Sequence, residues 1–114
     1  MTTSASDIIV VYITAPNLEE AQSLAHALVQ DKLAACVNII PGIQSVYFWE
    51  DAVQTDNELL LICKSQADRF DALKTRVQSL HPYDVPEVIS IPLQNGSEPY
   101  LNWVRENTTP KPKA

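Results

Sequence analysis

Residues 35–64 read ACVNIIPGIQSVYFWEDAVQTDNELLLICK, and this stretch decides the fold. Its two apolar ends, residues 35–40 and 58–64, are typical of strands, and the polar stretch over residues 50–57 predicts the tip of a hairpin between them. Pro41-Gly42 interrupts the first run without ending it, because the apolar pattern resumes directly afterwards. Such an interruption favours a bulge, a bend or an edge position. The sequence therefore predicts a hairpin of two unusually long strands.

On either side of this hairpin the chain alternates strand and helix. Residues 7–15, DIIVVYITA, form a β-branched run typical of a central strand. Asn17 is a predicted helix cap, and Leu18 to Lys32 carries apolar residues at helical spacing. Beyond the hairpin we expect a helix over residues 67–80, a strand over 88–91 and a short helix over 98–106. The order is βαββαβ plus a C-terminal helix, the ferredoxin-like α+β arrangement.

Length and charge narrow the class of protein. The chain has 114 residues, 46% of them hydrophobic, which suits one domain with a packed core. We expect an ordered core over about residues 7–106 and a flexible polar tail over residues 107–114. Asp and Glu total 14 against 8 Lys and Arg, a formal charge of -6. This excess argues against nucleic acid binding, because like charges repel.

No segment of the sequence predicts export or membrane insertion. The start, MTTSASD, lacks a basic region followed by a long apolar stretch. No apolar run approaches the roughly 20 residues that span a bilayer. Cys36 and Cys63 are too few for a disulfide scaffold and lie in apolar runs, as thiols do in a reducing compartment. We therefore expect a cytoplasmic protein that does not bind membranes.

The predicted fold leaves one face of its sheet uncovered. Both long helices of a ferredoxin-like fold pack on the same face, and only one short helix remains for the other. The hairpin also carries Tyr47, Phe48 and Trp49. An uncovered face beside an aromatic hairpin predicts self-association, because large exposed apolar patches mark interfaces. The alternative is a hairpin folded onto its own core.

The sequence contains no familiar catalytic or metal-binding motif. It has no CxxC, HExxH or GxSxG and only two glycines, so no enzymatic activity is predicted. His81 opens the proline-stiffened loop HPYDVPE and is a candidate ligand for a transition metal, although stabilising a helix C-terminus is the commoner role. Cys36 is a candidate thiolate ligand, although a small buried hydrophobe is again the commoner role, and Cys63 is interpreted as structural.

Several segments together resemble the CutA family, the divalent-cation tolerance proteins. The matching stretches run from about Ile9 to about Val104 and read KLAACVNIIPG, YFWE, ELLLICK, HPYDVPE and PYLNWV. The resemblance implies a ferredoxin-like subunit in a tight homotrimer, similar in architecture to the PII signalling proteins and often heat-stable. It also implies a role in tolerance to copper and other divalent cations. It implies no catalytic reaction and no required cofactor, with Cu2+ or another divalent cation as the expected ligand.

The metal site that the resemblance implies is only partly present. The family's copper ligands are a cysteine in the first strand and histidines that open the HPY loop. Ile13 and Leu80 occupy two of these positions here, so only His81 remains, with Cys36 as a further thiol. We therefore expect weaker or different metal binding, through residues of adjacent subunits.

By analogy with the family's intersubunit pocket, we expect a ligand pocket that contains Glu58, Lys64, Tyr83, Glu87 and Trp103. Taken alone, the charged residues of this group are typical of a solvated surface, and the two rings could line a pocket or merely pack. The alternative function is a PII-like signalling or scaffold trimer that binds a small anionic ligand or a partner protein in the same pocket.

Overall fold

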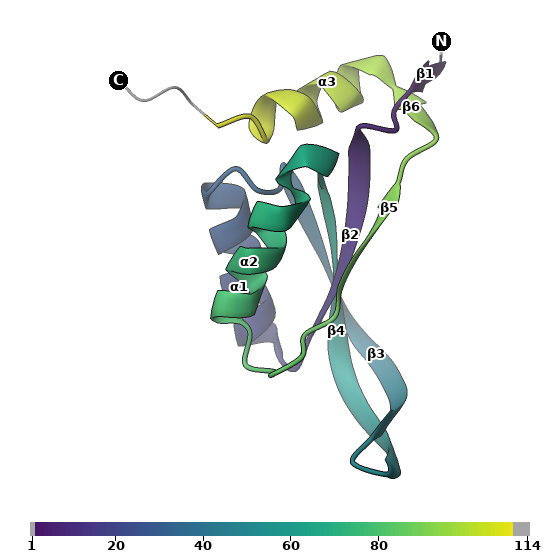
Figure 1. Cartoon of the computed structure of the whole chain (residues 1–114), viewed down its shortest axis with the longest axis vertical. Helices are drawn as coiled ribbons and strands as arrows, with labels where there is room; N and C mark the ends of the chain where they lie inside the picture. The colour runs from purple at the N-terminus through teal and green to yellow at the C-terminus, as the bar shows by residue number, and fades with distance from the viewer. Residues whose placement is uncertain (1, 111–114) are drawn as a thin grey trace.

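Four antiparallel strands form the sheet of this α+β protein in the computed structural model, which describes residues 2–110 (Figure 1). The strand order is β3-β4-β2-β5. β2 (Ile8–Ala15) lies between β4 (Ala52–Gln66) and β5 (Val88–Pro92), and β3 (Cys36–Trp49) pairs with the outer side of β4. The α+β class is confirmed, and the β-branched run of residues 8–15 is a central strand as predicted.

Two helices cover one face of this sheet. α1 (Leu18–Gln30) begins after Asn17, whose side-chain oxygen accepts a hydrogen bond from the Glu20 amide at 2.9 Å, so the predicted cap is present. α2 (Phe70–Leu80) follows a short 3-10 turn over Ala67–Arg69 and lies beside α1 in Figure 1. The apolar sides of both helices pack on the buried side of the sheet. This main core includes Val11, Ile13, Leu24, Leu28, Leu61, Leu73 and Val77.

A third helix, α3 (Glu98–Asn107), lies across one end of the sheet (Figure 1). Its apolar side packs in a second, smaller core with Ala5, Ile8, Ala35 and Leu93. Beside it, β1 (Thr2–Ser4) and β6 (Asn95–Ser97) form a two-stranded sheet that the sequence did not predict. None of the described helices is long and apolar enough to cross a membrane.

The chain remains packed slightly beyond the predicted end of the core. Asn107 still belongs to α3, and Thr108 is fully buried, with its hydroxyl donating to the Val104 carbonyl at 2.8 Å. Residues 111–114 of the predicted flexible tail lie outside the described residues. For them the tail stays a prediction.

The hairpin of β3 and β4 is longer than predicted. The expected polar tip over residues 50–57 is wrong, because only Glu50 and Asp51 form the turn, with φ values of 50° and 62°. β4 already begins at Ala52, and its polar first half pairs in register with β3. Backbone pairing with a well-formed strand therefore outweighs the low strand propensity of this segment. The paired hairpin projects beyond the helices (Figure 1).

The predicted interruption of β3 is a bulge. Ile40 pairs with Leu60 and Ile43 pairs with Glu58, so Pro41 and Gly42 together oppose one residue of β4. Gly42 has a φ of 81°, a conformation that a residue with a side chain adopts only under strain. The bulge leaves the hairpin continuous, as the sequence indicates.

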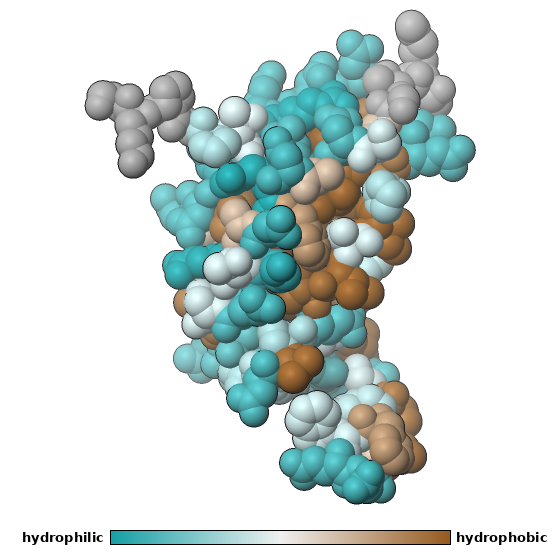
Figure 2. Space-filling view, in the orientation of Figure 1, coloured by the Kyte–Doolittle hydropathy of each residue, from teal (hydrophilic) through white to brown (hydrophobic). Residues whose placement is uncertain are grey.

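The second face of the sheet carries large apolar side chains that no described element covers. Ile40, Ile89 and Ile91 are 42%, 53% and 51% exposed. Figure 2 shows apolar residues along the strand side of the body and again on the projecting hairpin. On the hairpin, Val46 and Phe48 are about two-thirds exposed, at 65% and 68%. The hairpin is therefore not folded onto its own core, and the alternative interpretation is wrong for this chain.

Candidate functional site

The bulge determines which hairpin side chains share a face with Glu58. Alternate residues of a strand lie on one face, and directly paired residues share a face. Because Ile43 pairs with Glu58, the rings of Tyr47 and Trp49 lie on the Glu58 side, and Val46 points to the opposite side. The same face of β4 continues as the uncovered face of the sheet. The hairpin thus brings two aromatic rings to the end of that face.

The loop HPYDVPE, residues 81–87, connects α2 to β5 past the end of β2. His81 is only 8% exposed. Its Nε2 lies 2.7 Å from the Thr14 carbonyl oxygen, and the Tyr83 backbone N–H donates to its Nδ1 at 3.1 Å. A carbonyl oxygen only accepts, so Nε2 carries the proton and Nδ1 supplies the lone pair. The neutral imidazole therefore ties the end of β2 to the loop.

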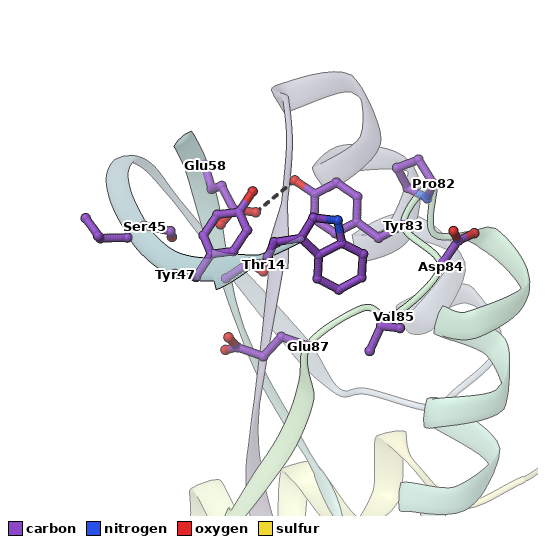
Figure 3. A pocket seen from close by; sticks show the side chains of 11 residues that line it. Thr14, Ser45, Tyr47, Glu58, Pro82, Tyr83, Asp84, Val85 and Glu87 are labelled. Carbon is purple, nitrogen blue, oxygen red and sulfur yellow. Dashed lines mark hydrogen bonds between the residues drawn. The ribbon is translucent and has the colours of Figure 1, made fainter. Parts of the chain in front are cut away.

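Tyr83 extends from this loop toward the hairpin and meets Glu58 (Figure 3). Its hydroxyl donates to Glu58 Oε2 at 2.9 Å. Burial, followed by this hydrogen bond to a carboxylate, raises the pKa of Tyr83 to about 12. Glu58 is 7% exposed, and its Oε1 has no hydrogen-bond partner among the described residues. On the hairpin, the Tyr47 hydroxyl donates to Asp56, and this hydrogen bond raises the pKa of Tyr47.

Between the hairpin, the end of β2 and the loop lies a pocket of about 640 Å³. Its walls include the rings of Tyr47, Trp49 and Tyr83 and the carboxylates of Glu58, Asp84 and Glu87. Figure 3 shows Tyr47 and Tyr83 entering from the hairpin and from the loop. Among the described residues that line the pocket there is no Lys, Arg or His, and none of the three carboxylates forms an ion pair. The pocket is aromatic and negatively charged.

The structure brings together three of the five residues expected in the ligand pocket. Glu58, Tyr83 and Glu87 line it, but Lys64 and Trp103 do not. Lys64 pairs with Val10 across the sheet, and the pocket residue Thr14 is four residues further along the same strand, so about 13 Å of strand separates the two ends. The Lys64 ammonium donates to Asn38. Trp103 packs against Tyr100 of α3 in a tilted arrangement, with ring centroids 5.6 Å apart.

His81 and Cys36 do not form a metal site within one chain. Both ring nitrogens of His81 are engaged by the protein itself. Cys36 pairs with Lys64, at the end of the sheet far from His81, and its thiol lies 3.9 Å from Asn38 Oδ1. The described residues contain no group of three or more His, Cys, Asp or Glu side chains that could hold a metal ion. The donor set that the resemblance implies for copper therefore does not fit this chain taken singly.

Cys63 has the structural role expected of it. The side chain is fully buried in the main core, and burial raises the pKa of its thiol to about 12. A thiol in that state is neutral at physiological pH and is neither a good nucleophile nor a good metal ligand.

Among the aromatic and acidic residues that line the pocket, three were not predicted as site residues. Tyr47 and Trp49 were predicted only as interface residues, and Asp84 was not singled out. The sequence does contain a signal for Tyr47 and Trp49, namely the alternation of side chains along β3. When the extra residue of the Pro41-Gly42 bulge is counted, both rings lie on the face of Glu58. Asp84 has no such signal, because its position depends on the path of a loop.

Comparison with known proteins gives a consistent result. The family described as "CutA1 divalent ion tolerance protein" matches residues 9–107. The chain is 52% identical over 99 residues to the divalent-cation tolerance protein CutA of Thermus thermophilus, covering 87% of this chain and 96% of that protein. It is 53% identical over 100 residues to the chloroplastic protein CutA of Arabidopsis thaliana, covering 88% of this chain and 55% of the plant protein. The chain thus spans about half of the plant relative.

The fold agrees with solved structures of the same group. The crystal structure of CutA1 from Oryza sativa superposes with a TM-score of 0.89 at 50% sequence identity, covering 94% of this chain and 98% of the rice chain. At this identity and coverage the two chains share one fold.

Proposed function

This chain belongs to the CutA1 family of divalent ion tolerance proteins, and on that basis we propose that it serves in the tolerance of divalent metal ions, copper among them, as a homotrimer. Its subunits are ferredoxin-like and assemble in the manner of the PII proteins. The proposal assigns it no catalytic activity and no required cofactor, and it places the protein in the cytoplasm.

The uncovered sheet face supports the homotrimer. Its isoleucines are about half exposed, and the hairpin adds further exposed apolar area. A stable monomer rarely exposes so much contiguous apolar surface, and burial of that surface contributes roughly 25 cal/mol per Å². A long edge strand such as β3 also presents unpaired backbone groups to a neighbouring strand.

One observation supports the intersubunit pocket. Glu58 and Lys64 carry opposite charges on the same face of the sheet, but they do not form an ion pair with each other within the chain. Glu58 is almost fully buried, with no cation near it among the described residues. Lys64 donates to the neutral side-chain amide of Asn38 and forms no ion pair among the described residues. A buried carboxylate without a counter-charge is costly. In a closed assembly, one subunit's Lys64 and Trp103 complete the pocket that another subunit's Glu58, Tyr83 and Glu87 begin.

The copper component of the proposal rests on family membership and on the two candidate ligands. His81 and Cys36 lie at opposite ends of the sheet, so a shared ion would take them from different subunits. His81 would also have to release the Tyr83 backbone N–H from Nδ1. Binding of Cu2+ is therefore expected to be weak. The alternative of an anionic ligand is supported only by fold analogy, because the pocket within one chain carries three carboxylates.

The assembly is tested first. Light scattering should give a particle of about three times the 12.7 kDa chain mass. A zero-length carbodiimide should then join Glu58 to Lys64 in trimers mixed from 14N- and 15N-labelled chains, and the joined peptides should include pairs of unlike isotope. A monomer, or a trimer without this mixed-isotope product, contradicts the intersubunit pocket.

The metal component is tested by calorimetric titration of the chelator-treated trimer with Cu2+. His81→Ala and Cys36→Ala should each reduce saturable binding, with His26→Ala as the control for loss of an exposed imidazole. Saturable binding that survives both substitutions would assign the ion to other residues.

A further inference from the structure

The pocket of about 640 Å³ combines two features that point to one class of ligand. Three aromatic rings form its walls, and the two from the hairpin, Tyr47 and Trp49, are 41% and 48% exposed. Three carboxylates surround the rings. One of them, Glu58, is almost fully buried and holds Oε1 free of any hydrogen bond from the described residues. Glu58 Oε1 is not among the buried atoms that lack a partner, so it is open to the cavity, where a carboxylate with no counter-charge among the described residues favours a cationic partner.

We propose that this pocket binds a small organic cation, with an ammonium or guanidinium head at Glu58 and a short aliphatic body against Tyr47, Trp49 and Tyr83. Aromatic faces attract such cations through the negative potential of the ring, and Trp does so most strongly. The aliphatic part gains from apolar burial on the same walls. The proposal deepens the pocket proposed above and rests on it only for the contribution of a second subunit.

An inorganic divalent cation fits the pocket less well. Metal ions require several donor atoms converging at 2.0–2.6 Å, and the described residues contain no such group of His, Cys, Asp or Glu. Asp84 and Glu87 are exposed on the loop, whereas Glu58 is buried on β4. Dispersed carboxylates and ring faces suit a cation that spreads its charge over a larger body.

The charge balance holds in the assembled trimer as well. Each pocket contains three carboxylates from one chain, and Lys64 of a neighbouring subunit would contribute one positive charge. If that ammonium reaches Glu58, it competes with the head of the ligand for this carboxylate, while Asp84 and Glu87 keep the pocket as a whole negatively charged. An anionic ligand would meet repulsion in either state.

The test compares n-butylammonium with n-butanol, which has a similar body and no charge. Each is titrated into 15N-labelled protein at constant ionic strength, and the indole Nε1–H resonances are followed by NMR. The chain has two tryptophans, of which Trp49 lines the pocket and Trp103 does not. We expect saturable shifts of the Trp49 signal with n-butylammonium and at least tenfold weaker binding of n-butanol. Guanidinium and tetramethylammonium should compete with n-butylammonium for the pocket, whereas Mg2+ at the same concentration should not.

Substitutions in the pocket identify the side chains that bind n-butylammonium. Glu58→Gln preserves the shape of the side chain and its acceptor for Tyr83 and should weaken n-butylammonium at least tenfold. Glu19→Gln removes an exposed carboxylate of α1 and should leave binding unchanged. Trp49→Leu, followed through the backbone amide signals of Tyr83, Asp84, Val85 and Glu87, should also weaken binding. Matched NMR spectra away from the pocket show that each variant is folded.

The outcomes separate this inference from the proposed assembly. Equal binding of n-butanol, binding unaffected by Glu58→Gln, or no binding to an intact trimer each overturns the organic cation. A Trp103 signal that shifts together with Trp49 places the second ring in the pocket from another subunit. Cation binding by a monomeric protein would sustain the inference while refuting the intersubunit pocket.

Discussion

Substitution of His81 by alanine tests whether this residue is a structural bridge. The imidazole donates to the Thr14 carbonyl and accepts from the Tyr83 backbone N–H, and the side chain is 8% exposed. Removing it leaves both backbone groups without a partner. An orphaned buried group costs about 1–3 kcal/mol, and the loop position of Tyr83 allows water to replace part of that loss. We therefore expect the free energy of unfolding to fall by about 2–4 kcal/mol.

The assay is urea unfolding followed by circular dichroism, at one fixed protein concentration because assembly couples to stability. His26→Ala is the matched control: His26 is exposed on α1, and its Nδ1 contacts only the Gln22 carbonyl of the preceding turn. The control should change stability by less than about 0.5 kcal/mol, as surface substitutions usually do. If His81→Ala is as mild as the control, His81 does not bridge the strand and the loop. Its engaged nitrogens would then be no obstacle to a metal ion.

Three further perturbations address other parts of the molecule. Because folding raises the pKa of Tyr83 from the ordinary value of 10.0 to about 12, ionisation of this tyrosine destabilises the fold, and the contribution of its neutral form should be lost between about pH 10 and pH 12. Tyr83→Phe should flatten this part of the curve of stability against pH, measured by urea unfolding. Arg105 donates to both carboxylate oxygens of Asp7 and lowers its pKa below 3.8, so this stabilisation is present above that pH and is lost on acidification below it. Asp7→Asn should cost at most about 1 kcal/mol at pH 7, because the pair is exposed, and less in 1 M salt; a larger, salt-independent loss would contradict a surface ion pair. Gly42→Ala should destabilise by about 1 kcal/mol from the positive φ alone, because nothing lies within 4 Å of the added methyl group, and an unchanged urea midpoint would show that the bulge relaxes.

The parts of the fold that the sequence predicted are those with local signals. Asn17 caps α1 because its short polar side chain reaches the amide of Glu20. Pro41-Gly42 marks the bulge because neither residue supports a regular ladder position. The prediction was wrong for residues 52–57, because their polar composition is typical of a loop and only pairing with β3 makes them a strand. β1 and β6 are three residues each, too short for any periodic pattern.

The candidate site was predicted less completely, for a different reason. The resemblance indicated Glu58, Tyr83 and Glu87, and the structure brings them into one pocket. It also indicated Lys64 and Trp103, which lie elsewhere in the chain. Whether they reach the pocket depends on a symmetry operation between subunits, which no property of an isolated sequence specifies.

The bulge links the fold to the chemistry of the pocket. Ahead of it, Ile40 lies on the uncovered face of the sheet, and in a regular strand Val46 and Phe48 would follow on the same face. The extra residue shifts the alternation of side chains by one position. Tyr47 and Trp49 therefore lie on that face, and the side chains of Val46 and Phe48 point to the opposite side. A regular strand would place Val46 and Phe48 on the Glu58 side, so Tyr83 from the loop would be the one hydroxyl left beside that carboxylate and β3 would offer no hydroxyl or indole N–H. The one-residue insertion at Gly42 therefore determines that β3 contributes a phenol and an indole to the pocket and not an isopropyl and a phenyl group. It does so without contributing a side chain of its own.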